Sequence, residues 1–323
     1  MKRLLRYLSW TGLFLLVLLI PAVVWISWQL VRDPLDAIRP GYSLQPTENP
    51  TPYSVELPGD IRTYTDYDMP VSTGDTIRWT VSLPDSLSGR IPVVLILGGL
   101  EIGRASLTYI EQHGPVALLA YEYPYSPTYW YEGTVIEEIP AIRNAILAVP
   151  GQVATIMNWA AGQSWADTTA LSVLGYSFGA FFIPASYRLM EEAHLPTGPA
   201  VIAYGGSDLY AIIRHNMKKL PDWQRTPVSW LAALSIHPID PDLYLPGMKA
   251  EKLFINGKQD DLIPFDLALR MQAQASGPTS IINLNEGHMH PRKKDLTSRL
   301  VRISRDWLDS RWKGDTTQVR MEE

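Results

Sequence analysis

The stretch that most constrains the fold is 169–179, where an apolar run of strand length leads directly into Gly175-Tyr176-Ser177-Phe178-Gly179. A serine in a Gly-x-Ser-x-Gly pattern between a strand and a helix is typical of a nucleophile elbow, a sharp turn that exposes the hydroxyl. The two glycines leave room for strand and helix to converge behind the serine. The amide of Phe178 begins the helix, so it has no helical partner and is available to an oxyanion. The pattern predicts Ser177 as a nucleophile.

The rest of the chain after residue 58 alternates apolar runs of strand length with helical patterns. This alternation predicts an α/β fold with one mostly parallel sheet and helices on both faces. The eight expected strands are 61–67, 76–83, 92–97, 116–121, 169–174, 200–204, 252–255 and 279–284, and the expected helices are 105–112, 136–160, 178–193, 264–275 and 292–313. Pro184 falls inside the third of these helices, where it would cost about 3 kcal/mol unless the helix bends.

Residues 207–249 form a long insertion between the sixth and seventh expected strands, with Trp223, Trp230 and several prolines. It is too long for a simple crossover. Long insertions at the carboxyl ends of strands are usually functional, which favours a cap over the pocket. A second packing layer without substrate contact is an equal alternative.

A serine is a poor nucleophile near neutral pH, so the elbow requires a histidine base and an acid that orients it. His288 lies in a Gly-His turn just after the last expected strand, where it can reach Ser177. His290 is the alternative base. A metal site built from these two histidines is disfavoured because no third ligand lies nearby in the sequence.

The acid is expected after the seventh strand, in the stretch 257–264. Gly257 turns the chain there, so the carboxylate of Asp260 can reach the far nitrogen of His288. Asp261 is adjacent and could take the role, and Asp208 after the sixth strand is a more distant candidate. The acidic pair could also simply begin a helix, where carboxylates are favoured.

With Ser177, Asp260 and His288 each at a strand end and in this order, the chain resembles the α/β-hydrolase family over residues 61–312. The motifs that carry the resemblance are the elbow, the Gly-x-x-Asp-x-x-Ile-Pro acid turn and the Gly-His turn. The resemblance implies an eight-stranded sheet and acyl chemistry without a cofactor or metal.

The resemblance also implies an oxyanion hole shared between the amide of Phe178 and the loop after the third strand, at Gly99 or Leu100. Leu97 precedes the glycines of that loop, where many members of the family have a histidine. Glu101 and Arg104 follow the loop and could bind a charged end of the substrate or lie solvated on the surface. An aromatic cluster after the fourth strand could line a cleft or pack under the cap: Tyr121, Tyr123, Tyr125, Tyr129, Trp130 and Tyr131.

The amino terminus reads as a membrane anchor, because Lys2, Arg3 and Arg6 precede 25 uncharged residues, 7–31. As a helix this run would be about 37 Å long, enough to cross roughly 30 Å of hydrocarbon with some tilt. A cleaved signal peptide would have a shorter apolar region and a small-residue cleavage site, whereas 23–28 is bulky. The basic residues place the amino terminus in the cytoplasm and the body outside a plasma or bacterial inner membrane.

The expected organisation is therefore a cytoplasmic tip and anchor over 1–32, a proline-rich linker over 33–58, a hydrolase domain over 59–314 and a polar tail over 315–323. The linker would act as a semi-rigid spacer that holds the body off the membrane. A formal charge of -5 gives no basic patch for nucleic acid, and the absence of cysteine excludes disulfides and thiol catalysis.

These features predict a membrane-anchored serine hydrolase that cleaves an ester, thioester or amide of a small-molecule or lipid-like acyl substrate, a carboxylic ester first. An acyltransferase or a peptidase with the same three residues is one alternative. A catalytically silent hydrolase-like domain used as a binding module is another, although a binding role alone would not require all three residues.

Overall fold

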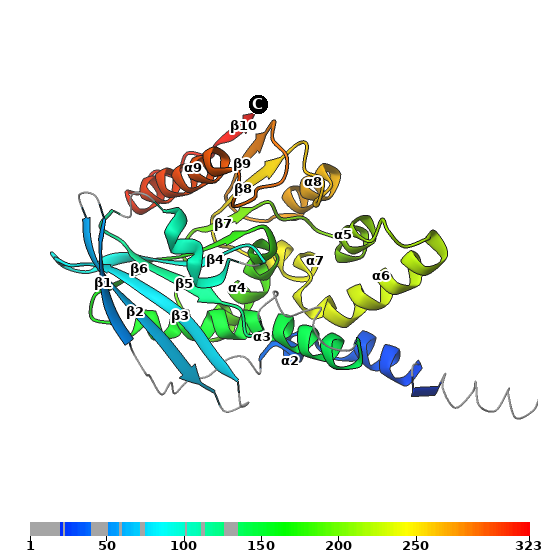
Figure 1. Ribbon diagram of the computed structural model, residues 1–323. Coiled ribbons are helices and arrows are strands. Elements are labelled where there is room, and N and C mark those ends of the chain that lie inside the picture. Colours follow the sequence, from blue (N-terminus) through cyan, green and yellow to red (C-terminus); the bar gives the residue numbers. More distant parts are fainter. Residues whose placement is uncertain are drawn as a thin grey trace, which may run out of the picture.

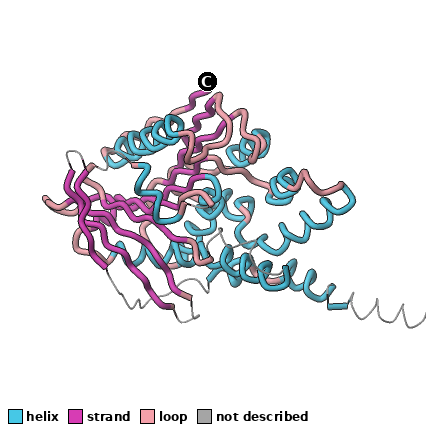
Figure 2. Tube along the Cα trace, in the orientation of Figure 1, coloured by secondary structure: helices cyan, strands magenta, loops and turns pink. Residues whose placement is uncertain are grey.

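The computed structural model describes residues 20–21, 23–39, 51–57, 60–71, 75–100, 102–110, 114–125 and 135–323. In this part of the chain the strands form one continuous sheet with helices on both sides (Figures 1 and 2). The sheet has ten strands in the order β1-β2-β3-β5-β4-β6-β7-β8-β9-β10. They are β1 (Thr51–Leu57), β2 (Asp60–Pro70), β3 (Thr76–Pro84), β4 (Ile91–Leu97), β5 (Ala117–Glu122), β6 (Ala166–Tyr176), β7 (Ala200–Ala203), β8 (Lys252–Gly257), β9 (Thr279–Leu284) and β10 (Arg320–Glu322).

The direction of pairing changes at β5. Strands β1, β2, β3 and β5 pair antiparallel with one another, and every pair from β5 through β4 to β10 is parallel. The carboxyl ends of β4, β6, β7, β8 and β9 therefore meet at one edge of the sheet, where ligands bind in α/β folds.

The expectation of eight strands is wrong at the two margins of the sheet, because β2 to β9 match the eight expected strands while β1 and β10 are additional. β1 contains Pro52 and pairs only with β2, and an edge strand tolerates a proline because one of its sides needs no partner. β10 has three residues paired with β9, too few for a strand pattern in the sequence.

The two faces of the sheet have different covers. On the α3 face, Val93, Leu95 and Leu97 of β4 belong to a core shared with α3 (Val135–Ala161), α4 (Ile183–Glu192) and α8 (Phe265–Gln274). On the α9 face, Val94 and Ile96 belong to a smaller core shared with the 3-10 helix η2 (Gly103–Tyr109) and with α9 (Lys294–Trp312). Figure 1 shows α9 on one side of the sheet and α3 with α4 on the other.

The helix expected over 178–193 is divided in two. A 3-10 turn, η4 (Ser177–Phe182), follows the elbow, and α4 begins only at Ile183. Pro184 therefore lies in the first turn of α4, where its missing amide hydrogen removes no helical hydrogen bond. The expected penalty for this proline does not arise.

The segment 33–58 differs from a simple linker. Residues Pro34–Ile38 form a short helix, α2, whose amino end is capped by Asp33 through a 2.9 Å hydrogen bond from the Leu35 amide. Leu35 and Ile38 are buried in the core of the α3 face. With β1 also inside this segment, parts of it are docked on the body, so the spacer expectation is wrong for 34–38 and 51–57. β10 likewise lies inside the expected polar tail.

The predicted membrane span lies largely outside the described residues, which exclude 1–19 and 22. Residues 23–31 are helical, with exposed side chains that include Val24, Trp28 and Val31. Among the described residues, one helix is long and apolar enough to cross a membrane, Glu137–Ala161 within α3. Its most apolar window is 61% buried inside the fold, as in the core helix of a globular domain. The anchor at 7–31 stays a prediction.

The insertion 207–249 is helical. It comprises α5 (Leu209–Asn216), α6 (Asp222–Ile236), η5 (His237–Ile239), α7 (Pro241–Tyr244) and η6 (Leu245–Gly247). Its carboxyl half packs against α2, α4 and α8, while α5 and α6 extend away from the sheet (Figure 1) and Trp223 is 75% exposed. The role of a cap over Ser177 stays a prediction.

Candidate active site

Ser177 sits at the tip of the turn that leaves the end of β6, with a backbone φ of 53°. A serine rarely adopts this left-handed conformation, so the surrounding structure must hold it there. A Cβ on Gly175 would lie 2.6 Å from the carbonyl oxygen of Gly179, and one on Gly179 would collide with the carbonyl oxygen of Leu97. Both glycines are therefore required by the close approach of β6, η4 and β4, as the pattern predicted.

The structure brings Ser177, His288 and Asp260 into one hydrogen-bonded chain. Ser177 Oγ lies 2.8 Å from His288 Nε2, and His288 Nδ1 lies 2.7 Å from Asp260 Oδ2. The side chains of His288 and Asp260 are 10% and 2% exposed, so the contact between them is shielded from water. With its Nδ1 proton directed at the carboxylate, the imidazole presents Nε2 as the acceptor for the serine hydroxyl proton.

The loops after β8 and β9 hold the acid and the base together. Backbone hydrogen bonds of 2.8 and 3.0 Å join the amides of Lys258 and Gln259 to the carbonyls of Leu284 and Glu286. A Cβ on Gly257 would collide with the Glu286 carbonyl oxygen, so only glycine permits this approach. The other oxygen of the Asp260 carboxylate accepts from the amides of Leu262 and Ile263, at 2.8 and 2.9 Å.

The alternative residues lie elsewhere. His290 Nδ1 accepts a hydrogen bond of 3.1 Å from the Arg292 amide. Asp261 is exposed, and its backbone carbonyl contacts the ring of His215. Asp208 caps α5 and pairs with Arg270. Among the residues that the structure describes, no cluster of three or more His, Asp or Glu could hold a metal ion.

The loop after β4 lies against the elbow. A Cβ on Gly99 would lie 3.9 Å from the Cβ of Ser177. The Gly98 carbonyl accepts a 2.6 Å hydrogen bond from the Tyr123 hydroxyl, and the Gly99 carbonyl accepts from the Ile102 amide at 3.1 Å. In a trans peptide the N–H points opposite to the C=O, so both bonds fix the directions of the Gly99 and Leu100 amides.

Tyr123 also contacts the elbow, since its ring centroid lies 5.3 Å from that of Phe178. It is 4% exposed, and burial raises the pKa of its hydroxyl far above the ordinary value, so it stays a hydrogen-bond donor. One tyrosine thus touches both segments expected to supply oxyanion donors.

The remaining substrate-binding candidates separate into described and undescribed residues. Tyr121 is buried and donates to Gln152 at 2.6 Å, so it packs within the fold, whereas Tyr125 is half-buried and donates to Glu138 at 2.8 Å. The Arg104 guanidinium forms two ion pairs, with Nε 3.6 Å from Glu122 Oε2 and Nη1 3.7 Å from Asp66 Oδ1. Three cluster members and one acidic candidate lie outside the described residues: Tyr129, Trp130, Tyr131 and Glu101.

Tyr204 is a site residue that the sequence analysis missed. Its ring packs edge-on against His288, with centroids 5.4 Å apart, and its backbone φ is 57°. Burial raises the pKa of its hydroxyl, with a smaller contribution from Asp260. It follows β7 directly, before Gly205, so its place at the end of a parallel strand was the available signal.

The comparisons with known proteins agree with this architecture. No protein-family model and no curated protein matches the chain. Among solved structures, it is similar to acetyl xylan esterase 1 from Thermoanaerobacterium sp. JW/SL YS485, with a TM-score of 0.62, 15% identity, and coverage of 83% of this chain and 90% of that one. It is also similar to an acetyl xylan esterase from Paenibacillus sp. R4, with a TM-score of 0.59, 17% identity, and coverage of 85% of this chain and 94% of that one.

A third structure, 2,6-dihydroxy-pseudo-oxynicotine hydrolase, has a TM-score of 0.56 and 15% identity, covering 80% of this chain and 70% of that one. The agreement extends over most of each chain although few residues are shared. The protein therefore has the α/β-hydrolase fold.

Proposed function

We propose that this protein is a serine hydrolase in which Ser177 attacks a carbonyl carbon, His288 acts as general base and Asp260 orients and stabilises the imidazole. The observation that carries the proposal is the hydrogen-bonded chain from Ser177 Oγ through His288 to Asp260, at 2.8 and 2.7 Å. This arrangement activates a serine in unrelated hydrolases.

The chemistry follows from those contacts. As Ser177 Oγ bonds to the carbonyl carbon, its proton passes to His288 Nε2 and negative charge develops on the carbonyl oxygen. Amides of Phe178 and of Gly99 or Leu100 stabilise that charge. His288 then gives the proton to the leaving group, and a water activated in the same way releases the acyl group from the serine.

A carboxylic ester is the first substrate class to test, with thioesters, amides and acyl transfer as the other outcomes of the same chemistry. Support for an ester comes from the names of two neighbours of the same fold, both acetyl xylan esterases. The identities of 15% and 17% leave the substrate of this chain to experiment.

A fluorophosphonate probe tests the nucleophile directly. The full chain should be labelled and should hydrolyse p-nitrophenyl acetate, and Ser177→Ala should abolish both. Ser172→Ala is a matched control, since Ser172 is a buried serine on β6, the strand that leads into Ser177. Labelling that survives Ser177→Ala rejects the nucleophile. A folded chain that neither reacts with the probe nor turns over acyl substrates favours the silent binding module.

We further propose that residues 7–31 anchor the protein in a plasma or inner membrane with the body outside. The support is the uncharged run and the three basic residues before it. Protease added to intact spheroplasts should digest the body, and the full chain should resist extraction by carbonate. Protection of the body from protease would reverse the orientation.

A further inference from the structure

We propose that a channel on the α9 face binds the acyl chain of the substrate, so that the protein prefers fatty acyl esters to acetate esters. This inference rests on the proposed function, because it assigns the substrate class of the Ser177 site.

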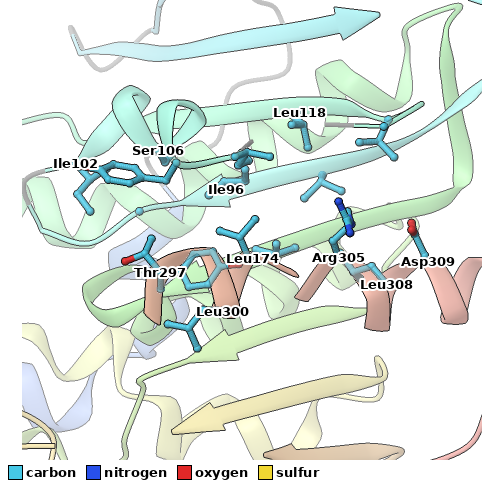
Figure 3. A pocket seen from close by; sticks show the side chains of 18 of the residues that line it. Ile96, Ile102, Ser106, Leu118, Leu174, Thr297, Leu300, Arg305, Leu308 and Asp309 are labelled. Carbon is cyan, nitrogen blue, oxygen red and sulfur yellow. The ribbon is translucent and has the colours of Figure 1, made fainter. Parts of the chain in front are cut away.

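The channel lies between η2 and α9, with strands β4, β5 and β6 as its floor (Figure 3). Its volume is about 100 Å³, and its lining is predominantly apolar. The floor is made by Ile96, Leu118 and Leu174, and the α9 wall includes Leu300 and Leu308. An apolar lining of this kind favours a ligand without charge along its length.

The shape of the channel fits a chain. The α9 wall extends from Thr297 to Trp312, which in a helix is a distance of about 22 Å. The lining residues are therefore spread along the helix, as the contacts of an extended hydrocarbon chain would be. Figure 3 shows Ile102, Ser106 and Thr297 toward one end and Arg305 with Asp309 toward the other.

One end of the channel borders the candidate active site. Gly98 and Gly99 line it, and Gly99 lies beside Ser177. Met289 also lines it and directly follows His288. The channel therefore ends between the loop that carries the proposed oxyanion donors and the loop that carries the base. A carbonyl held at Ser177 can extend its acyl chain into this passage.

A polar atom near that end also points to a ligand. Ser106 is only 8% exposed and its hydroxyl is buried. Among the described residues, this hydroxyl has no hydrogen-bond partner. Buried hydroxyls in native structures are nearly always satisfied. An ester oxygen at the head of a bound acyl chain would accept a hydrogen bond from this hydroxyl.

The chain-length profile of the full-length protein tests the channel. With p-nitrophenyl esters from acetate to octanoate, kcat/KM should rise about fourfold for each added methylene, which corresponds to about 0.8 kcal/mol per buried CH₂. Ser106→Phe and Val301→Phe, which fill the channel from opposite walls, should each lower the octanoate-to-acetate ratio at least about fifteenfold, equal to two methylenes. Leu269→Phe, at an exposed leucine on α8, is the control and should keep the profile.

A second measurement separates the channel from the chemistry. Decanoic acid should bind Ser177→Ala in calorimetry, and addition of Ser106→Phe or Val301→Phe should abolish the heat. A flat chain-length profile in a protein whose Ser177 is labelled by fluorophosphonate overturns the channel and leaves the hydrolase intact. Decanoic acid binding that is lost with Ser106→Phe, in a protein that shows no labelling, supports the channel and rejects the proposed function.

Discussion

The two faces of the sheet share the same strands but differ in how completely they are filled. On the α3 face, the helices α3, α4 and α8 cover a core in which Leu95, Leu119 and Val173 are fully buried. On the α9 face, the element after β4 is a seven-residue 3-10 helix, and the channel runs between it and α9. A 3-10 helix is narrow and rarely long, so it covers less of a sheet than an α-helix does.

The two faces of the sheet therefore have different roles. The α3 face packs the edge where Ser177, His288 and Asp260 meet, and the α9 face holds the cavity that we propose as the acyl-chain site. Side chains on adjacent residues of one strand point to opposite faces, so neighbouring substitutions can separate these two contributions.

The largest expected effect comes from the shared edge, where neither face can compensate. Asp260→Asn should lower kcat about 10⁴-fold, because the amide leaves the histidine in the wrong tautomer. Asp261→Asn is the matched control, since the adjacent carboxylate makes no contact with His288 in the described structure. Ester hydrolysis by the two variants measures the difference, and equal losses would show that the acid has been misassigned.

The second prediction compares the faces directly on β5. Leu119→Ala, on the α3 face, should lower the free energy of unfolding by about 3 to 5 kcal/mol, because it leaves a cavity in a filled core. Leu118→Ala, on the floor of the channel, should lower it by about 2 to 3 kcal/mol, because part of that side chain faces the channel and not packed neighbours. Urea denaturation of the two variants checks the difference. Equal costs would mean that the α9 face is packed as tightly as the α3 face.

The interior of the fold and the three hydrogen-bonded residues could be predicted because their signals are local. Each interior strand is a continuous apolar run, since both of its faces are covered. Ser177, Asp260 and His288 each lie in a short motif at a strand end, and parallel strands bring such ends to one edge.

The margins and the channel could not be predicted, because their causes are not local. β1 and β10 are fixed by hydrogen bonds to β2 and β9 rather than by their own patterns. The docking of Leu35 and Ile38 depends on a core formed by distant segments. The channel results from a gap between two helices, and the contact of Tyr204 with His288 depends on where parallel strands end.

The third prediction tests an electrostatic cost in the insertion that packs on the α3 face. Burial raises the pKa of Asp240 from 3.8 to about 6, with Asp242 and Asp208 adding to the rise and Arg270 opposing it. Because the pKa is higher in the folded state, the neutral acid is favoured there. The contribution of Asp240 to the stability of the folded state is fully present below about pH 4 and is lost as the pH rises through about 6.

Asp240→Asn should therefore match the wild type near pH 4 and exceed its stability at pH 7.5 by up to about 3 kcal/mol. The asparagine oxygen can still accept the 3.1 Å hydrogen bond from the amide of residue 242. Thermal unfolding from pH 4 to 8 measures the gap, with the exposed Asp306→Asn as control. A gap that narrows with rising pH would contradict the assignment.

The smallest expected effect links the α3 face to the loop that borders the channel. Tyr123 lies in the core of the α3 face, yet its hydroxyl holds the Gly98 carbonyl and its ring holds Phe178. Tyr123→Phe keeps the ring and removes one hydrogen bond, so it should lower kcat about tenfold, equal to about 1.4 kcal/mol, with little change in KM.

Tyr121→Phe is the matched control for this tyrosine, because its hydroxyl donates to Gln152 inside the core and does not reach the loop. If Tyr123 acts by aligning the Gly99 amide, its loss should weaken stabilisation of the oxyanion in the transition state and leave substrate binding in the channel unchanged. A rise in KM with unchanged kcat would instead mean that Tyr123 shapes the channel, and the separation of the two faces would fail at this residue.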